Sequence, residues 1–445
     1  MSRRNSGRRA PADRDVVDIE DLASNARGVG HVDGKAVFVA DTLPGERALY
    51  RPTKRKKSFD EASLETLFSA SPTRTTPRCQ HFGLCGGCAL QHAEADAQIA
   101  FKQTQLLSAL ARVGKVEPEI VLAPLIDAQW GYRRRARLGV KYVEKKGGTL
   151  VGFRERGAPF IALLRRCEVL VEEVGARLIE IAQMIDGLSI RERLPQIEVA
   201  VADNAIALVF RVLDPPTAAD LERLAAFGQA YEFSIYLQPG NENTIAALAD
   251  DAPALYYDLP TYDARLYFRP SDFVQIHAGI NRQMIDQALS LLDLSGDETV
   301  LELFAGLGNF SLPLARRAAR VITVEGEAGL VERARDNARI NNACNITAYV
   351  ENLFEPPANP AWLAEPVDKV LIDPPRSGAL EILDAVAATG ARRIVYCSCH
   401  PATLARDAHE LVHKHGYRLT HAGVMDMFPH TAHIESMAVF DRTQD

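Results

Sequence analysis

The C-terminal part of the sequence carries a thiol and a carboxylate that could act together as nucleophile and base. Cys397 and Cys399 lie in CSCHPATLARD, and Glu435 lies in HTAHIESM. We expect both cysteines at the end of a strand, where α/β sheets place their chemistry. Alternation puts them on one face, so periodicity does not choose between them. His400-Pro401 would end the strand and expose Cys399. Its pairing with Glu435 favours a transferase with a covalent intermediate over a buried apolar cysteine.

A second group of cysteines has the chemistry of a metal or cluster site. Cys79, Cys85 and Cys88 lie in CQHFGLCGGC, and Cys167 comes later in the chain. Four thiolates close a structural zinc site or an iron–sulfur cluster. Zinc ribbons favour two CxxC pairs and this sequence has only one, so we expect a [4Fe-4S] cluster rather than zinc.

A short glycine loop suits a nucleotide-type cofactor. In VLELFAGLGNFSLPLA, an expected strand runs into Gly306 and Gly308, where the backbone can approach a ligand, and then into a helix. The loop is not a full GxGxxG, so the prediction depends on polar residues at the ends of the next two strands. Glu325 closes the next strand, where an acid can take both ribose hydroxyls, and Asn352 ends the third strand.

The tetrapeptide Asp373-Pro374-Pro375-Arg376 ends the fourth expected strand. A related NPPY-type tetrapeptide serves amino-group methylation, with an aromatic residue stacked on the base. Arg376 occupies that place here, which argues against an amino acceptor. A plain strand-ending turn would explain the two prolines equally well.

The elements that must position these groups alternate from residue 273 onward. Five strand-like segments are separated by helical stretches, which predicts a doubly wound, Rossmann-like α/β sheet; they are VLELFA, RVITVEGE, ITAYVEN, KVLIDPP and RRIVYCSC. Upstream, helices at 93–113 and 171–187 among alternating strands predict an α+β middle domain. Short apolar runs over residues 16–67, with turn pairs at Asp33-Gly34 and Pro44-Gly45, predict a small oligonucleotide-binding type of barrel.

These patterns divide the chain into four expected parts. They are a disordered basic arm (1–14), the barrel (15–70), a central domain with the four-cysteine cluster (71–268) and a catalytic domain (269–445).

Composition and charge limit the class of protein. With 47% hydrophobic and 24% charged residues, the chain is typical of globular proteins, and no apolar run reaches the ~20 residues of a membrane helix. The basic N-terminus lacks the apolar core of a secretory signal, and seven cysteines without such a signal indicate a reducing cytoplasm.

Residues 1–58 carry 13 Lys and Arg against 8 Asp and Glu, a balance of +5; residues 130–170 carry 11 against 3, a balance of +8. Such segregation favours a phosphate-bearing partner, although a solvated surface explains charge alone equally well.

From about residue 15 to the C-terminus the chain resembles the RNA uracil-C5 methyltransferases. The resemblance is carried by CQHFGLCGGCALQ, DFVQIH, LELFAGLGNFSLPLA, IDPPRSG, YCSCHPATLARD and HTAHIESM, and GVGHVDGKAVFVADTLPGERA resembles a TRAM barrel, an RNA-binding module. The combination of barrel and cysteine cluster is most similar to the members that methylate 23S ribosomal RNA. The departures are Ala305, where the family often has cysteine, and His400, where asparagine is common.

The resemblance implies an S-adenosylmethionine-dependent methyltransferase domain, a TRAM barrel and an iron–sulfur middle domain. It assigns the nucleophile to Cys399 rather than Cys397 and the base to Glu435. The thiolate would add to C6 of uracil, C5 would take the methyl group, and Glu435 would remove the C5 proton. The cofactor contacts that it implies are Gln275, Phe304, Asn309, Glu325, Asn352 and Asp373.

The resemblance also implies partners: 23S ribosomal RNA, protein-free or in an early assembly intermediate, no membrane, and a monomeric enzyme. The target nucleotide would be flipped out of its stack. Three alternatives remain. A tRNA uracil-C5 methyltransferase lacks the cluster, a cytosine-C5 enzyme would carry a second cysteine where Arg376 stands, and an idle RNA-binding protein would need neither Cys399 nor Glu435. A zinc site at His430, His433 and Glu435 fits no common spacing.

Overall fold

The computed structural model describes residues 16–357 and 359–443. The basic arm expected at 1–14 lies outside the described residues. The described chain divides into two compact units. The first comprises the residues up to Phe101 together with His430–Ala432, and the second comprises Lys102–Pro429 and the chain from His433 onward. The expected four-part division is finer than this and stays a prediction.

The N-terminal strands of the first unit form a six-stranded sheet in the order β1-β5-β6-β4-β3-β2. Its strands are β1 (Val16–Asp18), β2 (Asp21–Leu22), β3 (Gly28–Val32), β4 (Lys35–Ala40), β5 (Arg47–Arg55) and β6 (Phe59–Ser69). The sheet curls, so that β1 at one edge contacts β3 near the other edge. A Cβ at Gly30 would lie 2.2 Å from the carbonyl oxygen of Asp18, so only glycine allows this close approach. The curled sheet encloses a small apolar core, as the strand pattern predicted.

The rest of the first unit is a cysteine-bearing loop and the start of α1 (Ala95–Ala109). This loop also holds the short His430–Ala432 segment. The amides of Ala89 and Leu90 both donate to the carbonyl of His430, at 2.8 and 2.9 Å. Gln98 on α1 accepts a further hydrogen bond from the amide of His430 at 2.9 Å.

Two sheets and three helices make up the first half of the second unit. The larger sheet has the order β13-β12-β11-β10-β8-β9 and the smaller pairs β14 with β15. The strands are β8 (Arg135–Val143), β9 (Gly148–Gly152), β10 (Gln196–Val201), β11 (Ile206–Arg211), β12 (Phe233–Gln238), β13 (Ala246–Ala247), β14 (Leu255–Leu259) and β15 (Ala264–Phe268). The helices are α2 (Glu172–Gly175), α3 (Leu178–Asp186) and α4 (Ala218–Tyr231). Single 3₁₀ turns occur at Glu144–Lys146, Arg191–Arg193, Glu242–Thr244 and Pro260–Tyr262.

Two helices differ from their expected extent. The helix expected over 93–113 is α1 followed by a π-helical turn, Leu110–Gly114. The helix expected over 171–187 is divided into α2 and α3. At this break, the carbonyl of Gly175 accepts the amide of Cys167 at 3.0 Å. A Cβ at Gly175 would lie 2.3 Å from the carbonyl oxygen of Cys167. The backbone at Cys167 therefore occupies space that the side chains of a continuous helix would need.

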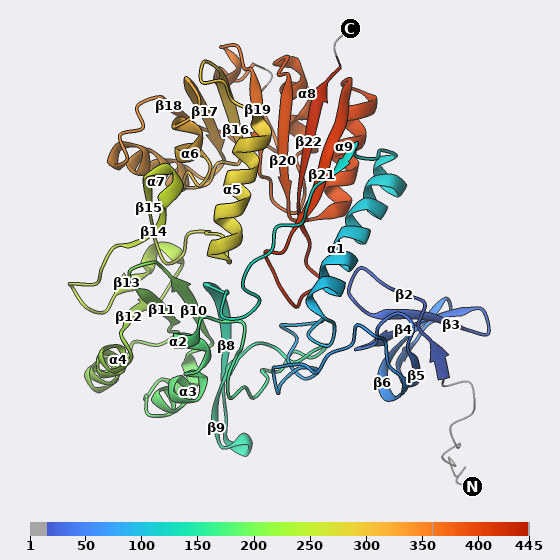
Figure 1. The fold of residues 1–445 in the computed structure, drawn as a ribbon. Coiled ribbons are helices and arrows are strands. Elements are labelled where there is room, and N and C mark those ends of the chain that lie inside the picture. Colours follow the sequence, from blue (N-terminus) through green and yellow to red (C-terminus); the bar gives the residue numbers. More distant parts are fainter. Residues whose placement is uncertain (1–15, 358, 444–445) are drawn as a thin grey trace, which may run out of the picture. The chain divides into compact units, whose positions relative to one another are not determined.

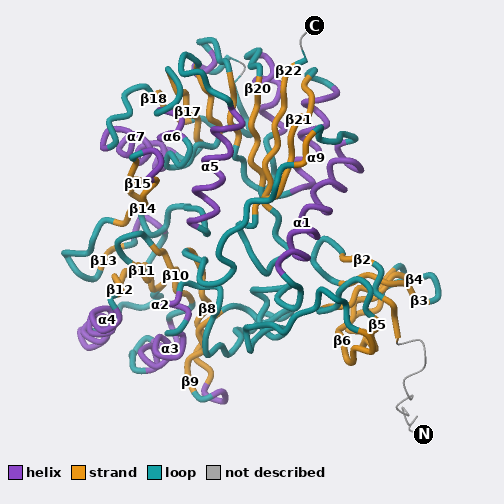
Figure 2. The backbone as a smooth tube through the Cα atoms, viewed as in Figure 1, coloured by secondary structure: helices purple, strands orange, loops and turns teal. Residues whose placement is uncertain are grey.

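The second half of the unit is the doubly wound sheet that the sequence predicted, with the order β18-β17-β16-β19-β20-β22-β21-β7. Its strands are β7 (Ile120–Val121), β16 (Thr299–Leu303), β17 (Arg320–Glu325), β18 (Ile346–Val350), β19 (Lys369–Ile372), β20 (Arg393–Ser398), β21 (Tyr417–Met425) and β22 (Glu435–Arg442). Its helices are α5 (Ala278–Leu292), α6 (Ser311–Ala315), α7 (Ala328–Ile340), α8 (Leu383–Ala388) and α9 (Pro401–His413), with 3₁₀ turns at Ala361–Leu363 and Leu380–Ile382. Figure 1 shows α5 beside β20, with which it is in contact, and Figure 2 shows the strands in orange between purple helices. Within the described ranges, no helix has the length and apolar character that a bilayer span requires.

Strand direction determines where side chains from distant segments meet. The strands β16 to β20 run parallel, so their carboxyl ends share one edge of the sheet. The chain leaves β16 on one side for β17 and β18 and returns beside it as β19, which makes this a topological switch point. β22 runs antiparallel to β20, so the start of β22 lies at the same edge.

Candidate active site

A cavity of about 800 Å³ opens at this edge of the sheet. All eight residues predicted for catalysis and cofactor binding line it: Gln275, Phe304, Asn309, Glu325, Asn352, Asp373, Cys399 and Glu435. Five of them follow or end the parallel strands, because carboxyl ends converge there. The structure therefore brings the predicted residues together, and their individual roles remain proposals.

The loop after β16 has the backbone geometry of a ligand cradle. Phe304 has φ of 62° and Gly306 has φ of 57°, both in the left-handed region. A Cβ at Gly306 would meet no atom within 4 Å, so one side of this backbone is open. The amides of Gly306 and Glu327 donate to the two carboxylate oxygens of Glu325, each at 3.0 Å. Each oxygen keeps a lone pair, which leaves Glu325 able to accept two hydroxyl groups.

Behind this loop, Glu302 is an acid in an otherwise apolar strand, and no role was predicted for it. It is 1% exposed, and the hydroxyl of Ser311 donates to its Oε2 at 2.5 Å. Burial raises the pKa of Glu302 to about 8. The contact ties β16 to the first turn of α6 and so braces the loop between them. An acid within VLELFA was the signal that could have indicated this role.

Asn309 lines the cavity but is engaged by protein groups. Its Oδ1 accepts from the hydroxyl of Tyr257 at 2.9 Å and from Nδ2 of Asn281 at 3.0 Å, and its own Nδ2 donates to Oδ1 of Asn281 at 2.8 Å. One amide proton therefore remains for a ligand. Neither Tyr257 nor Asn281 had a sequence signal, since both contacts depend on tertiary structure.

The structure separates the two cysteines that periodicity left equivalent. β20 ends at Ser398, so Cys397 lies inside the strand, is 1% exposed and packs in the apolar core. Cys399 lies just beyond the strand and lines the cavity. Burial raises the pKa of Cys399 to about 12, and the carboxylates of Glu435 and Asp373 act in the same direction, whereas Arg376 opposes them.

Strand register aligns Cys399 with Glu435. β20 pairs with β22 through Cys397 opposite Met437 and Ser398 opposite Ser436. One further step along this antiparallel register sets Cys399 opposite Glu435. The candidate nucleophile, just after the end of β20, and the candidate base, at the start of β22, therefore lie at the same level on neighbouring strands.

Glu435 has a histidine partner that the sequence indicated only as a possible metal ligand. Nε2 of His433 lies 2.9 Å from Oε1 of Glu435. Burial raises the pKa of Glu435, and the hydrogen bond from His433 opposes that shift. Burial also raises the pKa of Asp373, to about 7, with the charge of Glu435 acting in the same direction. A carboxylate of raised pKa is a stronger proton acceptor than an exposed one.

Arginines in β8 and just before it form a basic part of the same cavity. Arg133, Arg135 and Arg137 line it together with Glu198, and all three come from the +8 segment. The guanidinium of Arg133 lies over the ring of Phe153 at 5.5 Å, and Arg137 pairs with Glu198 at 2.7 Å. The charge pattern had indicated this segment but no single residue of it.

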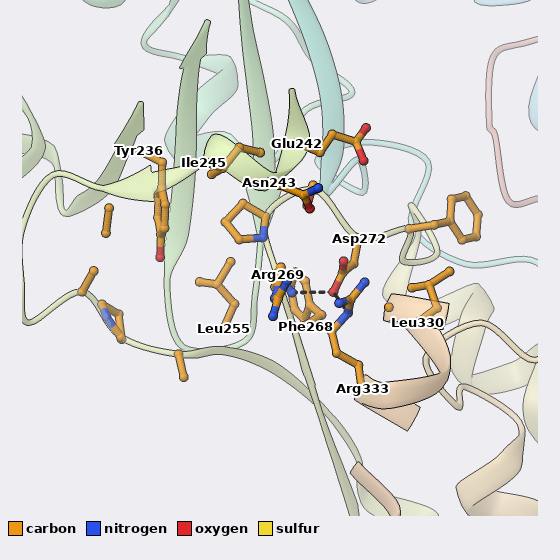
Figure 3. A pocket seen from close by; sticks show the side chains of 18 of the residues that line it. Tyr236, Glu242, Asn243, Ile245, Leu255, Phe268, Arg269, Asp272, Leu330 and Arg333 are labelled. Carbon is orange, nitrogen blue, oxygen red and sulfur yellow. Dashed lines mark hydrogen bonds and ion pairs between the residues drawn. The ribbon is translucent and has the colours of Figure 1, made fainter. Parts of the chain in front are cut away.

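A second cavity, of about 940 Å³, lies beside the first and shares Phe273 and Leu330 with it. Figure 3 shows its lining, in which Arg333 pairs with Asp272 at 2.6 Å. None of the eight predicted residues lines this cavity. The predicted chemistry therefore belongs to the first cavity.

The four cysteines of the expected cluster belong to different units. Cys79, Cys85 and Cys88 lie in one loop of the first unit and Cys167 in the second. The amide of Gly87 lies 3.4 Å from the sulfur of Cys85, a donor arrangement that suits a thiolate ligand. In the described part of the chain, no group of three or more His, Cys, Asp or Glu side chains is arranged to hold a metal ion. The chemistry of the four thiol donors fits a cluster.

Known proteins resemble the chain along almost its whole length. The family model "tRNA (Uracil-5-)-methyltransferase" matches residues 95–350 and 365–443, and a TRAM domain model matches residues 16–49. The 23S rRNA (uracil(1939)-C(5))-methyltransferase RlmD of Alkalilimnicola ehrlichii is 54% identical over 98% of both chains. The RlmD of Methylococcus capsulatus is 49% identical over 99% of this chain and all of its own. The chain belongs to the RNA uracil-C5 methyltransferase family.

A solved family structure has the same fold. The tRNA (uracil-54, C5)-methyltransferase of Pyrococcus abyssi, in complex with S-adenosyl-L-homocysteine, matches with a TM-score of 0.74 at 24% identity and covers 96% of this chain and all of its own. The methyltransferase fold and the N-terminal TRAM domain predicted from the sequence are thereby confirmed.

Proposed function

We propose that this family member transfers a methyl group from S-adenosylmethionine to C5 of a uridine in 23S ribosomal RNA, giving 5-methyluridine. The relatives that match over the full length are named for uracil 1939, and we assign the equivalent uridine to this chain. The observation that carries the chemistry is the meeting of Cys399, Glu435 and the cofactor loop in one cavity. Deleting the gene should remove this 5-methyluridine from 23S RNA, as mass mapping of nucleosides would show. Loss from transfer RNA instead would contradict the assignment.

The residue types match what uracil requires. C5 is too weak a carbon nucleophile to take a methyl group unaided. Addition of the Cys399 sulfur to C6 makes the ring an enolate, whose C5 can attack the methyl carbon. Glu435 then accepts the C5 proton, and the electrons of that C–H bond restore the ring double bond as Cys399 leaves. Since a stacked base hides C6, the target nucleotide must be flipped into the cavity.

Ionisation of Cys399 is the demanding part of this mechanism. Burial raises the pKa of Cys399 to about 12, so the thiol is protonated at neutral pH and must lose its proton before the sulfur adds to C6. Positive charge in the cavity lowers such a pKa, and Arg376 already acts in that direction. The bound cofactor would supply a methyl group on a positively charged sulfur, which adds to the effect of Arg376.

The cofactor assignment predicts a specific loss of affinity. Replacing Glu325 by alanine should weaken S-adenosylhomocysteine binding about 10- to 100-fold, since two hydrogen bonds to a charged acceptor are lost. Calorimetry would measure this. Glu327→Ala is the control, because the Glu327 side chain is 65% exposed and lines only the second cavity. Binding of NADH in preference to S-adenosylhomocysteine would contradict the assignment.

We propose that the RNA partner is 23S RNA, either protein-free or in an early assembly intermediate, and that the enzyme acts as a monomer. Flipping a nucleotide into an enclosed cavity requires an RNA segment not yet covered by ribosomal proteins. The basic residues of the segments 1–58 and 130–170, which include the TRAM match and Arg133, Arg135 and Arg137, would bind its phosphates.

We further propose that Cys79, Cys85, Cys88 and Cys167 hold a [4Fe-4S] cluster. The support is the four-thiol donor set and the amide beside the Cys85 sulfur. The cluster would stabilise the protein, because the catalytic residues lie elsewhere in the chain.

Anaerobically purified protein should therefore be brown and contain about four iron atoms per chain. Cys88→Ser should lose colour and iron, whereas Cys344→Ser should keep both, because Cys344 is exposed and outside the set. Metal analysis and the visible spectrum would measure this. A colourless protein with one zinc per chain would overturn the proposal.

A further inference from the structure

Lys102 on α1 is a fully buried lysine, with 0% of its side chain exposed. Its Nζ donates to Oδ1 of Asp426 at 2.6 Å and to the carbonyl oxygen of Phe428 at 2.9 Å. Lysine is almost never fully buried unless it is paired, because removing its charge from water is costly. Burial accordingly lowers the pKa of Lys102, and Asp426 opposes this shift. Because an apolar side chain could fill this position without that cost, the buried lysine indicates a specific structural or functional role.

The partners of Lys102 belong to the turn that leads toward Glu435. Asp426 follows the end of β21, and its amide donates to the carbonyl of Leu125 at 2.9 Å. At the other end of the turn, the carbonyl of Pro429 accepts the hydroxyl of Tyr132 at 3.1 Å. Lys102 makes two of the contacts that hold the turn between these points.

From this turn, contacts within the second unit run to the base. The ring of Phe428 packs edge-on against the ring of His433, with centroids 4.4 Å apart and an interplanar angle of 77°. His433 in turn lies 2.9 Å from Oε1 of Glu435. Phe428, His433 and Glu435 all line the proposed catalytic cavity, whereas Lys102 does not.

We propose that Lys102 is a positioning residue for Glu435: by holding Asp426 and the carbonyl of Phe428, it sets the Phe428 ring against His433 and thereby orients the carboxylate that removes the C5 proton. The inference rests on the proposed role of Glu435. Proton removal requires a base within about 2.6–3.2 Å of its target. A misplacement of about 1 Å reduces a rate by about 100-fold.

The test removes both charges together, because Lys102→Met alone leaves Asp426 buried without its partner. The double variant Lys102→Met/Asp426→Asn keeps the shapes and leaves no unpaired charge. The probe is RNA carrying tritium at C5 of the target uridine, since tritium release reports proton removal directly. We expect release to slow by about 10-fold or more. The methyl-labelled, denaturant-resistant protein–RNA complex should accumulate, while its rate of formation and the KM for RNA stay within twofold of wild type.

A matched control exists in the doubly wound sheet. Lys369 is also buried and pairs with Glu298 at 3.0 Å, but it begins β19 and so lies at the opposite edge from the cavity. Lys369→Met/Glu298→Gln removes a similar buried pair and should release tritium at the wild-type rate. Equal slowing in both double variants would mean a general structural effect and would overturn the proposal.

Two further variants keep the outcomes distinct. Asp426→Asn alone, a nearly isosteric change, keeps the Lys102 contact with Phe428 but leaves the buried lysine without its countercharge, so it should show a defect of the same kind. Wild-type release in both Asp426→Asn and the Lys102 double variant would refute the role of Lys102. Glu435→Gln is measured alongside them. If it stalls while the Lys102 double variant does not, only this inference fails; if it releases tritium normally, the proposed base fails as well.

Discussion

Replacing Cys399 by alanine is expected to abolish the covalent protein–RNA complex and to reduce methylation by roughly 10⁴-fold or more, the order expected when a covalent nucleophile is lost. Without the thiolate no bond forms at C6, and C5 stays too weak a nucleophile to attack the methyl group. RNA containing 5-fluorouridine at the target provides the measurement. Fluorine does not leave as a cation, so wild-type enzyme should remain trapped on this RNA as a complex that survives denaturant.

Cys397→Ala is the matched control for this prediction. Cys397 is 1% exposed and belongs to the apolar core, so its loss removes one sulfur from packing and leaves the cavity unchanged. That variant should still be trapped by the fluorinated RNA. Peptide mapping of the trapped wild-type complex should identify Cys399, and a cross-link at Cys397 would reverse the assignment.

Replacing Glu435 by glutamine should have an equally large effect on turnover, with the opposite effect on the complex. The variant should add to C6 and transfer the methyl group, then stall, because no base removes the C5 proton and Cys399 is not eliminated. A denaturant-resistant complex carrying the methyl label should therefore accumulate on ordinary RNA. Gel analysis with radiolabelled cofactor would measure it.

The double variant Cys399→Ala/Glu435→Gln checks that the accumulated complex depends on the proposed nucleophile. It should form no labelled complex, because without Cys399 no bond to C6 forms and the step that requires Glu435 is never reached. Wild-type turnover by the single Glu435→Gln variant would remove that carboxylate from the mechanism.

The cavity lining was predictable because it follows from strand order and direction. Glu325, Asn352 and Asp373 end or follow parallel strands, so their expected positions coincide at one edge of the sheet. The family resemblance added Gln275 and assigned the base to Glu435, a carboxylate that the sequence had already paired with Cys399; neither position follows from that rule. Periodicity alone did not distinguish Cys399 from Cys397, because the choice depends on β20 ending at Ser398.

The features that the sequence did not predict depend on contacts between distant segments. Asn281 and Tyr257 reach Asn309 from α5 and β14, and no local pattern indicates such hydrogen bonds. The expected helix after the glycine loop covers only Ser311–Ala315. The chain then turns toward β17, where the amide of Ala319 donates to the carbonyl of Glu298 at 3.0 Å. The helical pattern of the sequence does not reveal this hydrogen bond, because its acceptor, the carbonyl of Glu298, belongs to a different segment of the chain.

The antiparallel register between β20 and β22 gives this enzyme an unusual sensitivity to chain length. Ser398 faces Ser436 across the ladder, and the thiol and carboxylate stand one step beyond that pair. Deleting a single residue from either strand would shift the ladder by one position and turn one of the two side chains to the other face of the sheet. Such a protein could keep its apolar core and melt normally, yet its two reactive groups would no longer meet. Near this edge, single-residue insertions and deletions should therefore be far more damaging than conservative substitutions at the same positions.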